Sequence, residues 1–267
     1  MKKSVKTVSL SLLTAILLIM TLFLSACSNG RESGMAGSPP HGDVPVSSAD
    51  NKFNTSSSEN SAPDKNSSTE KSETVTMDDA LFIGDSRTVG LMDYGRIEGA
   101  NFFCNVGMSV YNIHKKPVSV PNVGKVTLTE LLENKRYGKI YIMLGVNEVG
   151  YEADSTVKKY SGLIDLIKEK QPDAYIFIQA NLHVSKKRSD TDRVVNNTAI
   201  NALNTRLSKL ADVRNRIFYL DANAIFDDSE GGLSSEKSGD SAHPYAKYYI
   251  EWGSWIIRQT ASLIEES

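Results

Sequence analysis

A serine, a histidine and an aspartate stand in motifs that could support nucleophilic catalysis. Ser86 ends the tripeptide Gly84-Asp85-Ser86, and Asp240 and His243 lie three residues apart near the end of the chain. A serine hydroxyl becomes a good nucleophile when a histidine takes its proton and a carboxylate orients that histidine. The Asp-x-x-His spacing lets the carboxylate reach one ring nitrogen while the other faces Ser86. These residues predict acyl transfer through a serine nucleophile.

The neighbours of His243 bear on its role. Pro244 follows it directly, and proline at the first helical position would fix the exit of this turn into the helix expected next. Taken alone, His243 could instead cap that helix or pack against it. His114, beside two lysines, and His183, which has no carboxylate close to it in the sequence, are weaker candidates for a base.

Two further residues could stabilise the negative oxygen of a tetrahedral intermediate, which needs fixed hydrogen-bond donors. Asn147, in the motif Gly145-Val146-Asn147, could offer its side-chain amide, and Gly107 could offer an unobstructed backbone N–H. The N–H of Ser86, at a helix N-terminus, is a third donor. Asn and Gly are also ordinary turn residues, so neither motif is informative alone.

Five short apolar runs would position these motifs, and each is expected to be a buried parallel strand. The runs are residues 80–83, 101–106, 139–144, 174–178 and 217–220. Helical spacing of apolar residues recurs over residues 155–170 and 198–213, and from about residue 244 onward. Strands that alternate with helices predict a doubly wound α/β sandwich. Such sheets bind ligands beyond the carboxyl ends of their strands, which is where the motifs fall.

Together, the motifs resemble the signature blocks of the SGNH (GDSL-type) hydrolases. The blocks are Gly84-Asp85-Ser86, Gly107, Gly145-x-Asn147 and Asp240-x-x-His243, in this order. The resemblance implies a flavodoxin-like three-layer α/β/α sandwich with a five-stranded parallel sheet. It implies Ser86 as nucleophile, His243 as base and Asp240 as its orienting carboxylate. It also implies an oxyanion hole formed by the N–H groups of Ser86 and Gly107 and the amide of Asn147, and neither a metal nor an organic cofactor.

Two residues depart from the family pattern without removing a catalytic group. Glu148 follows Asn147 where many members have aspartate, and Arg87 follows Ser86 in place of a small or apolar residue. Both are candidate substrate-binding residues. Arg87 could bind an anionic substrate beside the nucleophile, or it could pair with a surface carboxylate.

The N-terminus has the pattern of an export signal, with a basic start and a largely apolar stretch over residues 8–24. The tetrapeptide that ends at Cys27 resembles the lipobox of bacterial lipoproteins. This resemblance implies cleavage of residues 1–26 and diacylation of Cys27, and two acyl chains anchor a protein stably to a membrane. An ordinary signal peptide or an uncleaved anchor is the alternative. We therefore expect an extracytoplasmic, lipid-anchored protein.

Differences in composition divide the rest of the chain into two segments. Residues 27–76 are rich in Ser and Asn and poor in apolar residues, which predicts a disordered tether, and residues 77–267 are expected to form the catalytic domain. Cys104 falls in a predicted strand and should be a buried, inert thiol. With 30 Lys and Arg against 32 Asp and Glu, the net charge is −2 and no basic stripe is present, which argues against a nucleic-acid partner.

Two loops could shape a substrate site. Residues 181–197 carry four basic side chains that could steer an acidic polymer toward the site, or that could simply be solvated. These side chains are Lys186, Lys187, Arg188 and Arg193, and Asp190 and Asp192 partly cancel their charge. Residues 115–125 form a second candidate rim loop.

The motifs and the expected location favour an O-acyl esterase that releases acyl groups, with acetyl as the leading choice, from carbohydrate or cell-wall polymers or from small esters. An acyltransferase on envelope glycans shares the first half-reaction, so the motifs do not separate the two. A lipid-directed esterase is a further alternative, although no long apolar loop suggests an acyl tunnel. A non-catalytic surface-binding lipoprotein is the last, and the intact set of site residues argues against it. The sequence gives no oligomeric state.

Overall fold

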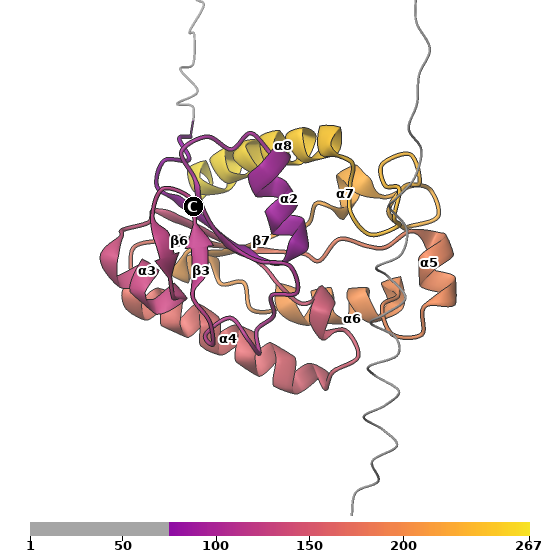
Figure 1. Ribbon diagram of the computed structural model, residues 1–267, viewed down its shortest axis with the longest axis horizontal. Coiled ribbons are helices and arrows are strands. Elements are labelled where there is room, and N and C mark those ends of the chain that lie inside the picture. Colours follow the sequence, from indigo (N-terminus) through magenta and orange to yellow (C-terminus); the bar gives the residue numbers. More distant parts are fainter. Residues whose placement is uncertain (1–74) are drawn as a thin grey trace, which may run out of the picture. The chain divides into compact units, whose positions relative to one another are not determined.

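The computed structural model of the protein describes residues 75–267 (Figure 1). The predicted signal peptide (residues 1–26), the lipidation site Cys27 and nearly all of the predicted tether (residues 27–76) lie outside the described residues. Within the described part of the chain, no helix is both long and apolar enough to cross a membrane.

Five parallel strands form the central sheet, in the spatial order β2-β1-β5-β6-β7. The strands are β1 (Ala80–Gly84), β2 (Asn101–Cys104), β5 (Lys139–Met143), β6 (Tyr175–Gln179) and β7 (Ile217–Leu220). Each overlaps one of the five apolar runs, so the predicted α/β fold with a five-stranded parallel sheet is confirmed. The chain leaves β1 first toward β2 and later returns to its other side as β5. This reversal is the topological switch point at which doubly wound sheets bind ligands.

Helices cover both faces of this sheet (Figure 1). One hydrophobic core lies between the sheet and the helices α3 (Leu128–Asn134), α4 (Ala153–Lys170) and α6 (Asn197–Ser208). A second core lies between the opposite face and the helices α2 (Ser86–Tyr94), α7 (Asn223–Phe226) and α8 (Ala246–Glu265). The predicted three-layer sandwich is therefore confirmed. The helices α2 and α8 pack on the same face of the sheet.

An aromatic ladder crosses the sheet on the face that α8 covers. One ring from each strand stacks on the next, with centroid separations of 5.0, 4.3, 4.8 and 5.5 Å. The rings, in spatial order, are Phe102, Phe82, Tyr141, Phe177 and Phe218, and they are register partners. A slip of one residue would turn every ring to the opposite face, so the ladder fixes the register. It thereby fixes where the strands end, which is where the site residues begin.

Several connections differ from the sequence-based expectations. The predicted rim loop of residues 115–125 contains most of an antiparallel hairpin, β3 (Val118–Val120) and β4 (Gly124–Val126). Its turn has Pro121 followed by Asn122 at a φ of +62°, which is a type II arrangement that Asn tolerates. The predicted basic loop of residues 181–197 contains the short helix α5 (Lys186–Thr191).

Cys104 ends β2 and is buried against the second core. Burial raises the pKa of its thiol to about 12, so the thiol stays protonated at neutral pH. This is the buried state expected from the sequence.

Candidate active site

Ser86 is the first residue of α2 and follows β1 after one intervening residue, Asp85. The Asp85 side chain is fully buried and caps the helix, because its carboxylate accepts the N–H of Arg87 at 3.0 Å. Gly84 is required here, since a Cβ at this position would lie 1.9 Å from Oγ1 of Thr88. The sharp turn leaves Ser86 half-buried at a helix N-terminus, whose free N–H groups favour a negative oxygen.

His243 lies between Ser86 and Asp240. Its Nε2 is 2.9 Å from Oγ of Ser86, although 157 residues separate the two in sequence. Its Nδ1 is 2.7 Å from Oδ2 of Asp240. Both distances are in the range of hydrogen bonds. The structure thus brings the three predicted triad residues into one continuous chain of contacts.

Asp240 is held by a compact turn. Its Oδ1 accepts the N–H groups of Ala242 at 2.9 Å and His243 at 2.7 Å, together with the hydroxyl of Ser238 at 3.2 Å. Partial burial opposes ionisation of this carboxyl, but the hydrogen bonds from His243 and Ala242 outweigh it and hold the pKa of Asp240 below its usual range. The carboxylate is therefore ionised throughout the pH range in which His243 could act as a base.

The prediction that Pro244 begins the following helix was wrong. The helix α8 begins at Ala246, with Tyr245 as its N-cap residue in an extended conformation. Pro244 instead forms an isolated antiparallel bridge with Ser238. The turn that carries His243 is thus closed by this bridge, and the chain runs on for one more residue before the helix starts.

The structure contradicts one of the two roles considered for Arg87. Its side chain is only 2% exposed, so it cannot pair with a surface carboxylate. Nε donates to the carbonyl of Ala242 at 3.1 Å, which ties α2 to the loop that carries His243. Burial lowers the pKa of Arg87, and the adjacent Asp85 partly opposes this. Nη1 is buried without a hydrogen-bond partner among the described residues.

Gly107 and Asn147 lie beyond the carboxyl ends of β2 and β5, the two strands that flank β1. Gly107 has a φ of +72°, a conformation that a side chain would strain. Asn147 lies in the short 3₁₀ helix η1 (Val146–Glu148), and its Nδ2 donates to the carbonyl of Met108 at 2.9 Å. Because an amide nitrogen carries two N–H groups, one remains for a ligand.

Glu148, a candidate substrate-binding residue from the sequence, has a structural contact in the fold. The side chain is buried, and Oε1 accepts the N–H of Val110 at 2.6 Å. Burial raises the pKa of this carboxyl to about 7, although the Val110 N–H opposes the shift. Glu148 therefore connects η1 to the segment after Gly107, so that the two candidate oxyanion segments are joined by two hydrogen bonds.

A small cavity of about 120 Å³ opens at the triad. Its walls are Ser86, Arg87, Val146, Asn147, Val184, Arg188, Val195, Ala242 and His243. The valines were not expected to be site residues, and Arg188 was expected only as one charge of the basic loop. The position of Val184 could have indicated this role, because the residue lies shortly after the carboxyl end of β6. The other site residues lie at the same edge of the sheet.

No carboxylate is close to His183 in the sequence, but the fold brings one to it. Its Nδ1 is 2.7 Å from Oδ2 of Asp227, and its Nε2 is 2.8 Å from Oδ1 of Asn201. Burial would lower the pKa of His183, but these hydrogen bonds and the charge of Asp227 raise it overall. With both ring nitrogens engaged, His183 supports the loop after β6 and has no nitrogen free for a substrate.

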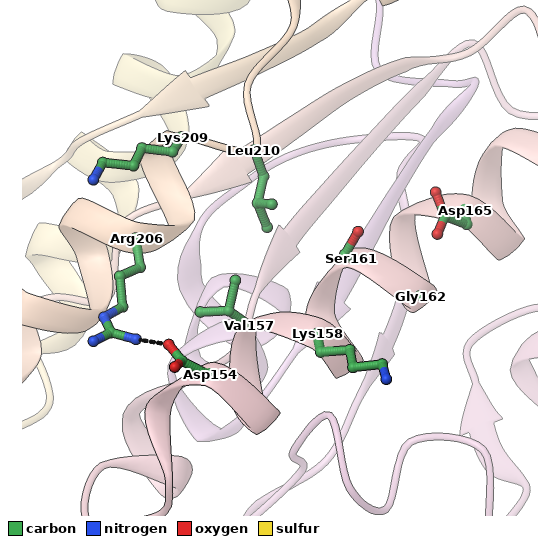
Figure 2. A pocket seen from close by; sticks show the side chains of 9 residues that line it. All are labelled: Asp154, Val157, Lys158, Ser161, Gly162, Asp165, Arg206, Lys209 and Leu210. Carbon is green, nitrogen blue, oxygen red and sulfur yellow. Dashed lines mark hydrogen bonds and ion pairs between the residues drawn. The ribbon is translucent and has the colours of Figure 1, made fainter.

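A larger hollow of about 660 Å³ lies on the outer surface between α4 and the end of α6 (Figure 2). Val157 and Leu210 line it, and an ion pair between Arg206 and Asp154 closes one side. No predicted site residue belongs to it. This hollow is therefore separate from the triad.

A parallel α/β sheet that gathers a serine, a histidine and an aspartate at its carboxyl edge is an arrangement found among serine hydrolases. The model of the GDSL-like lipase/acylhydrolase family matches residues 82–249, which include every predicted site residue of the domain, and the chain belongs to this family. The resemblance seen in the motifs is confirmed, and the protein is a serine esterase. No curated protein matches the sequence.

Solved structures share the fold. A Streptococcus pneumonia protein provisionally assigned as a platelet activating factor aligns with a TM-score of 0.54 and 19% identity, over 71% of this chain and 86% of that chain. A GDSL-like lipase from Bacteroides thetaiotaomicron aligns with a TM-score of 0.51 and 18% identity, over 68% and 87% of the two chains. A provisionally assigned acylhydrolase from Bacteroides fragilis aligns with a TM-score of 0.50 and 17% identity, over 71% of this chain and 92% of that chain.

Proposed function

We propose that this esterase hydrolyses short O-acyl esters, with acetyl as the acyl group, on carbohydrate or cell-wall polymers. The observation that carries the proposal is the contact chain from Ser86 Oγ through His243 to Asp240, with distances of 2.9 and 2.7 Å. This chain supplies a nucleophile, a base and an orienting carboxylate in hydrogen-bonding geometry.

In the proposed reaction, Ser86 Oγ attacks the acyl carbon while Nε2 of His243 takes its proton. The negative oxygen of the tetrahedral intermediate is stabilised by the N–H groups of Ser86 and Gly107 and by the free N–H of Asn147. Collapse breaks the bond to the sugar oxygen, which takes the proton from His243 and leaves as a hydroxyl, and an acyl-enzyme remains. Water then attacks the acyl carbon with His243 again as base, which releases the carboxylic acid and restores Ser86.

The size of the cavity at Ser86 supports a short acyl group. Its volume of about 120 Å³ equals roughly four water molecules of the liquid, and is below the range of about 300–1,000 Å³ in which proteins enclose drug-sized ligands. A two-carbon acyl group fits this space, whereas most of a fatty acyl chain would extend beyond it. The cavity therefore favours an acetyl esterase over a lipid-directed one.

The proposed location follows from the N-terminal sequence. Cleavage before Cys27 and acylation of that residue would tether the catalytic domain outside the cell membrane, near wall and surface polymers. Incorporation of an alkyne-bearing fatty acid into the wild-type chain, and its loss in the Cys27→Ala variant, is the expected result. A wild-type chain that takes up no lipid would remove this part of the proposal.

The triad is tested on the full chain with a fluorophosphonate probe and with p-nitrophenyl acetate. Ser86→Ala should abolish both labelling and turnover, while Ser161→Ala, on α4 at the separate hollow, should leave both unchanged. Labelling that persists in Ser86→Ala would refute the nucleophile. Acetate release from O-acetylated wall material, with and without a deacetylated acceptor glycan, then separates a hydrolase from an acyltransferase.

A further inference from the structure

Three cavities of the described domain contain predicted site residues, and in the two that border Ser86 and Gly107 basic side chains occur without acidic ones. The third, of about 190 Å³, includes Glu148 together with Arg206. The cavity at Ser86 includes Arg87 and Arg188. The second cavity, of about 390 Å³, begins at Gly107 and includes Lys115 and Lys116. No Asp or Glu belongs to the lining of either of these two cavities. Positive groups therefore line both the cavity at Ser86 and the cavity at Gly107.

This charge pattern does not follow from composition, because the whole chain has a net charge of −2. Other cavities in the described domain have acidic residues in their walls. The hollow of Figure 2 includes Asp154 and Asp165 beside its basic residues. A hollow of about 570 Å³ near the start of β5 includes Asp79 and Asp173. The excess of positive charge is thus a property of the cavities next to the nucleophile.

The four cations differ in how far they are already neutralised. Lys115 and Lys116 form no ion pair with any other described residue. Nε of Arg188 lies 3.6 Å from Oδ2 of Asp192, and the Arg188 side chain is 36% exposed. Nη1 of Arg87 is buried without a partner among residues 75–267. Arg87 is only 2% exposed and lies beside the buried carboxyl of Asp85, so a substrate anion does not reach it.

We propose that the acyl ester is carried by an acidic glycan, whose carboxylate or phosphate groups bind Lys115, Lys116 and the exposed part of Arg188. The inference rests on the proposed function. It adds that the glycan which bears the acyl group, and which is released as the alcohol, is acidic. The acyl group would occupy the small cavity near Arg87 and Arg188, and an adjoining sugar would occupy the larger cavity beyond Gly107. At about 390 Å³, that cavity lies within the size range of ligand sites, roughly 300–1,000 Å³.

The test compares three substrates that differ in one group: O-acetylated methyl glucoside, its glucuronic acid counterpart and its 6-phosphate. The wild-type full chain should show kcat/KM at least about tenfold higher for one or both acids than for the neutral sugar. The preference should shrink when salt is raised from about 0.01 to 1 M, because the Debye length falls from roughly 30 to 3 Å. The two acidic arms tell whether carboxylate or phosphate is the preferred group.

Lys115 and Lys116 are the residues to change, since neither belongs to the proposed triad or oxyanion hole. The double variant Lys115→Gln, Lys116→Gln should lose about fivefold or more of the acid preference while p-nitrophenyl acetate turnover stays unchanged. The matched control, Lys158→Gln with Lys209→Gln, removes two lysines from the separate hollow and should keep the preference.

Two results would overturn the inference. Equal kcat/KM for the neutral and acidic sugars in the wild type would show that the cations do not select the substrate. A full acid preference in the Lys115 and Lys116 double variant would show that these lysines do not supply it. If the wild type hydrolyses no ester at all, p-nitrophenyl acetate included, the proposed function itself fails and this inference fails with it.

Discussion

Asp240 holds His243 at two points: its Oδ1 accepts the backbone N–H and its Oδ2 contacts the ring Nδ1, both at 2.7 Å. The same carboxylate therefore sets the position of the turn and the orientation of the imidazole. Since Nδ1 is engaged, Nε2 is the nitrogen that faces Ser86, which is the orientation that a general base requires.

Asp240→Asn should reduce kcat by on the order of 10⁴, because an amide at this place favours the wrong tautomer of the histidine. The measurement is turnover of p-nitrophenyl acetate, with thermal denaturation to show that the variant folds. Asp190→Asn, at an exposed carboxylate on α5, is the matched control and should keep wild-type turnover. A loss smaller than about tenfold would contradict the assigned role.

Asn147→Ala removes one candidate oxyanion donor and the hydrogen bond to Met108. We expect kcat to fall roughly 10²–10³-fold, which corresponds to about 3–4 kcal/mol of transition-state stabilisation. Loss of the Met108 bond alone should cost about 1 kcal/mol of unfolding free energy. If only stability changes and kcat stays within about tenfold of the wild type, Asn147 acts as a turn residue.

Arg87→Lys keeps the positive charge but loses the Nε donor to Ala242. Because that bond joins α2 to the loop of His243, we expect kcat to fall by about tenfold or more, with a loss of about 1–3 kcal/mol in stability. Arg96→Lys, outside the site cavity, serves as control. An unchanged kcat together with a raised KM would instead place Arg87 in substrate binding only.

Glu148→Gln tests the carboxyl whose pKa burial raises to about 7. The folded chain keeps this proton up to about pH 7, whereas the unfolded chain releases it near 4.5, so wild-type stability falls as pH rises between these values. The total loss is on the order of 2–3 kcal/mol. Gln cannot ionise and can still accept the N–H of Val110, so the variant should lack this loss.

The measurement for Glu148→Gln is the free energy of unfolding by denaturant at pH 5 and pH 8, for wild type and variant. The stability of the variant relative to the wild type should increase between the two pH values. Glu133→Gln, at an exposed carboxylate on α3, should show no such increase. A constant difference between variant and wild type would mean that Glu148 is already ionised in the folded protein at pH 5.

Continuous apolar runs made the five strands predictable, because strands buried on both faces leave no polar positions. The hairpin of β3 and β4 was missed for the opposite reason. Its strands have three residues each, and β3 alternates Val118, Ser119 and Val120 with only the middle residue exposed. Short, partly exposed strands resemble loops in sequence, although the Pro121-Asn122 pair is a recognisable turn signal.

The residues of the site that belong to recognisable sequence motifs could be predicted. Ser86, Gly107 and Asn147 follow predicted strands, so their meeting at one edge of the sheet follows from topology. Pairings between distant segments that belong to no recognised motif could not be predicted, such as His183 with Asp227, which lies 44 residues away. The burial of Arg87 and Glu148 was also hidden, because long charged side chains are ordinarily exposed.

Between α7 and α8 the chain contains no helix or strand among the described residues, only two isolated bridges. His243 and Asp240, the proposed base and its carboxylate, lie on this stretch. Ser86, the proposed nucleophile, instead follows strand β1 after a single residue, Asp85. Irregular segments with few regular hydrogen bonds open at lower free energy than the sheet. Moderate heating should therefore abolish activity reversibly at temperatures below that of thermal unfolding. In that temperature range the circular dichroism spectrum should still be that of the folded protein.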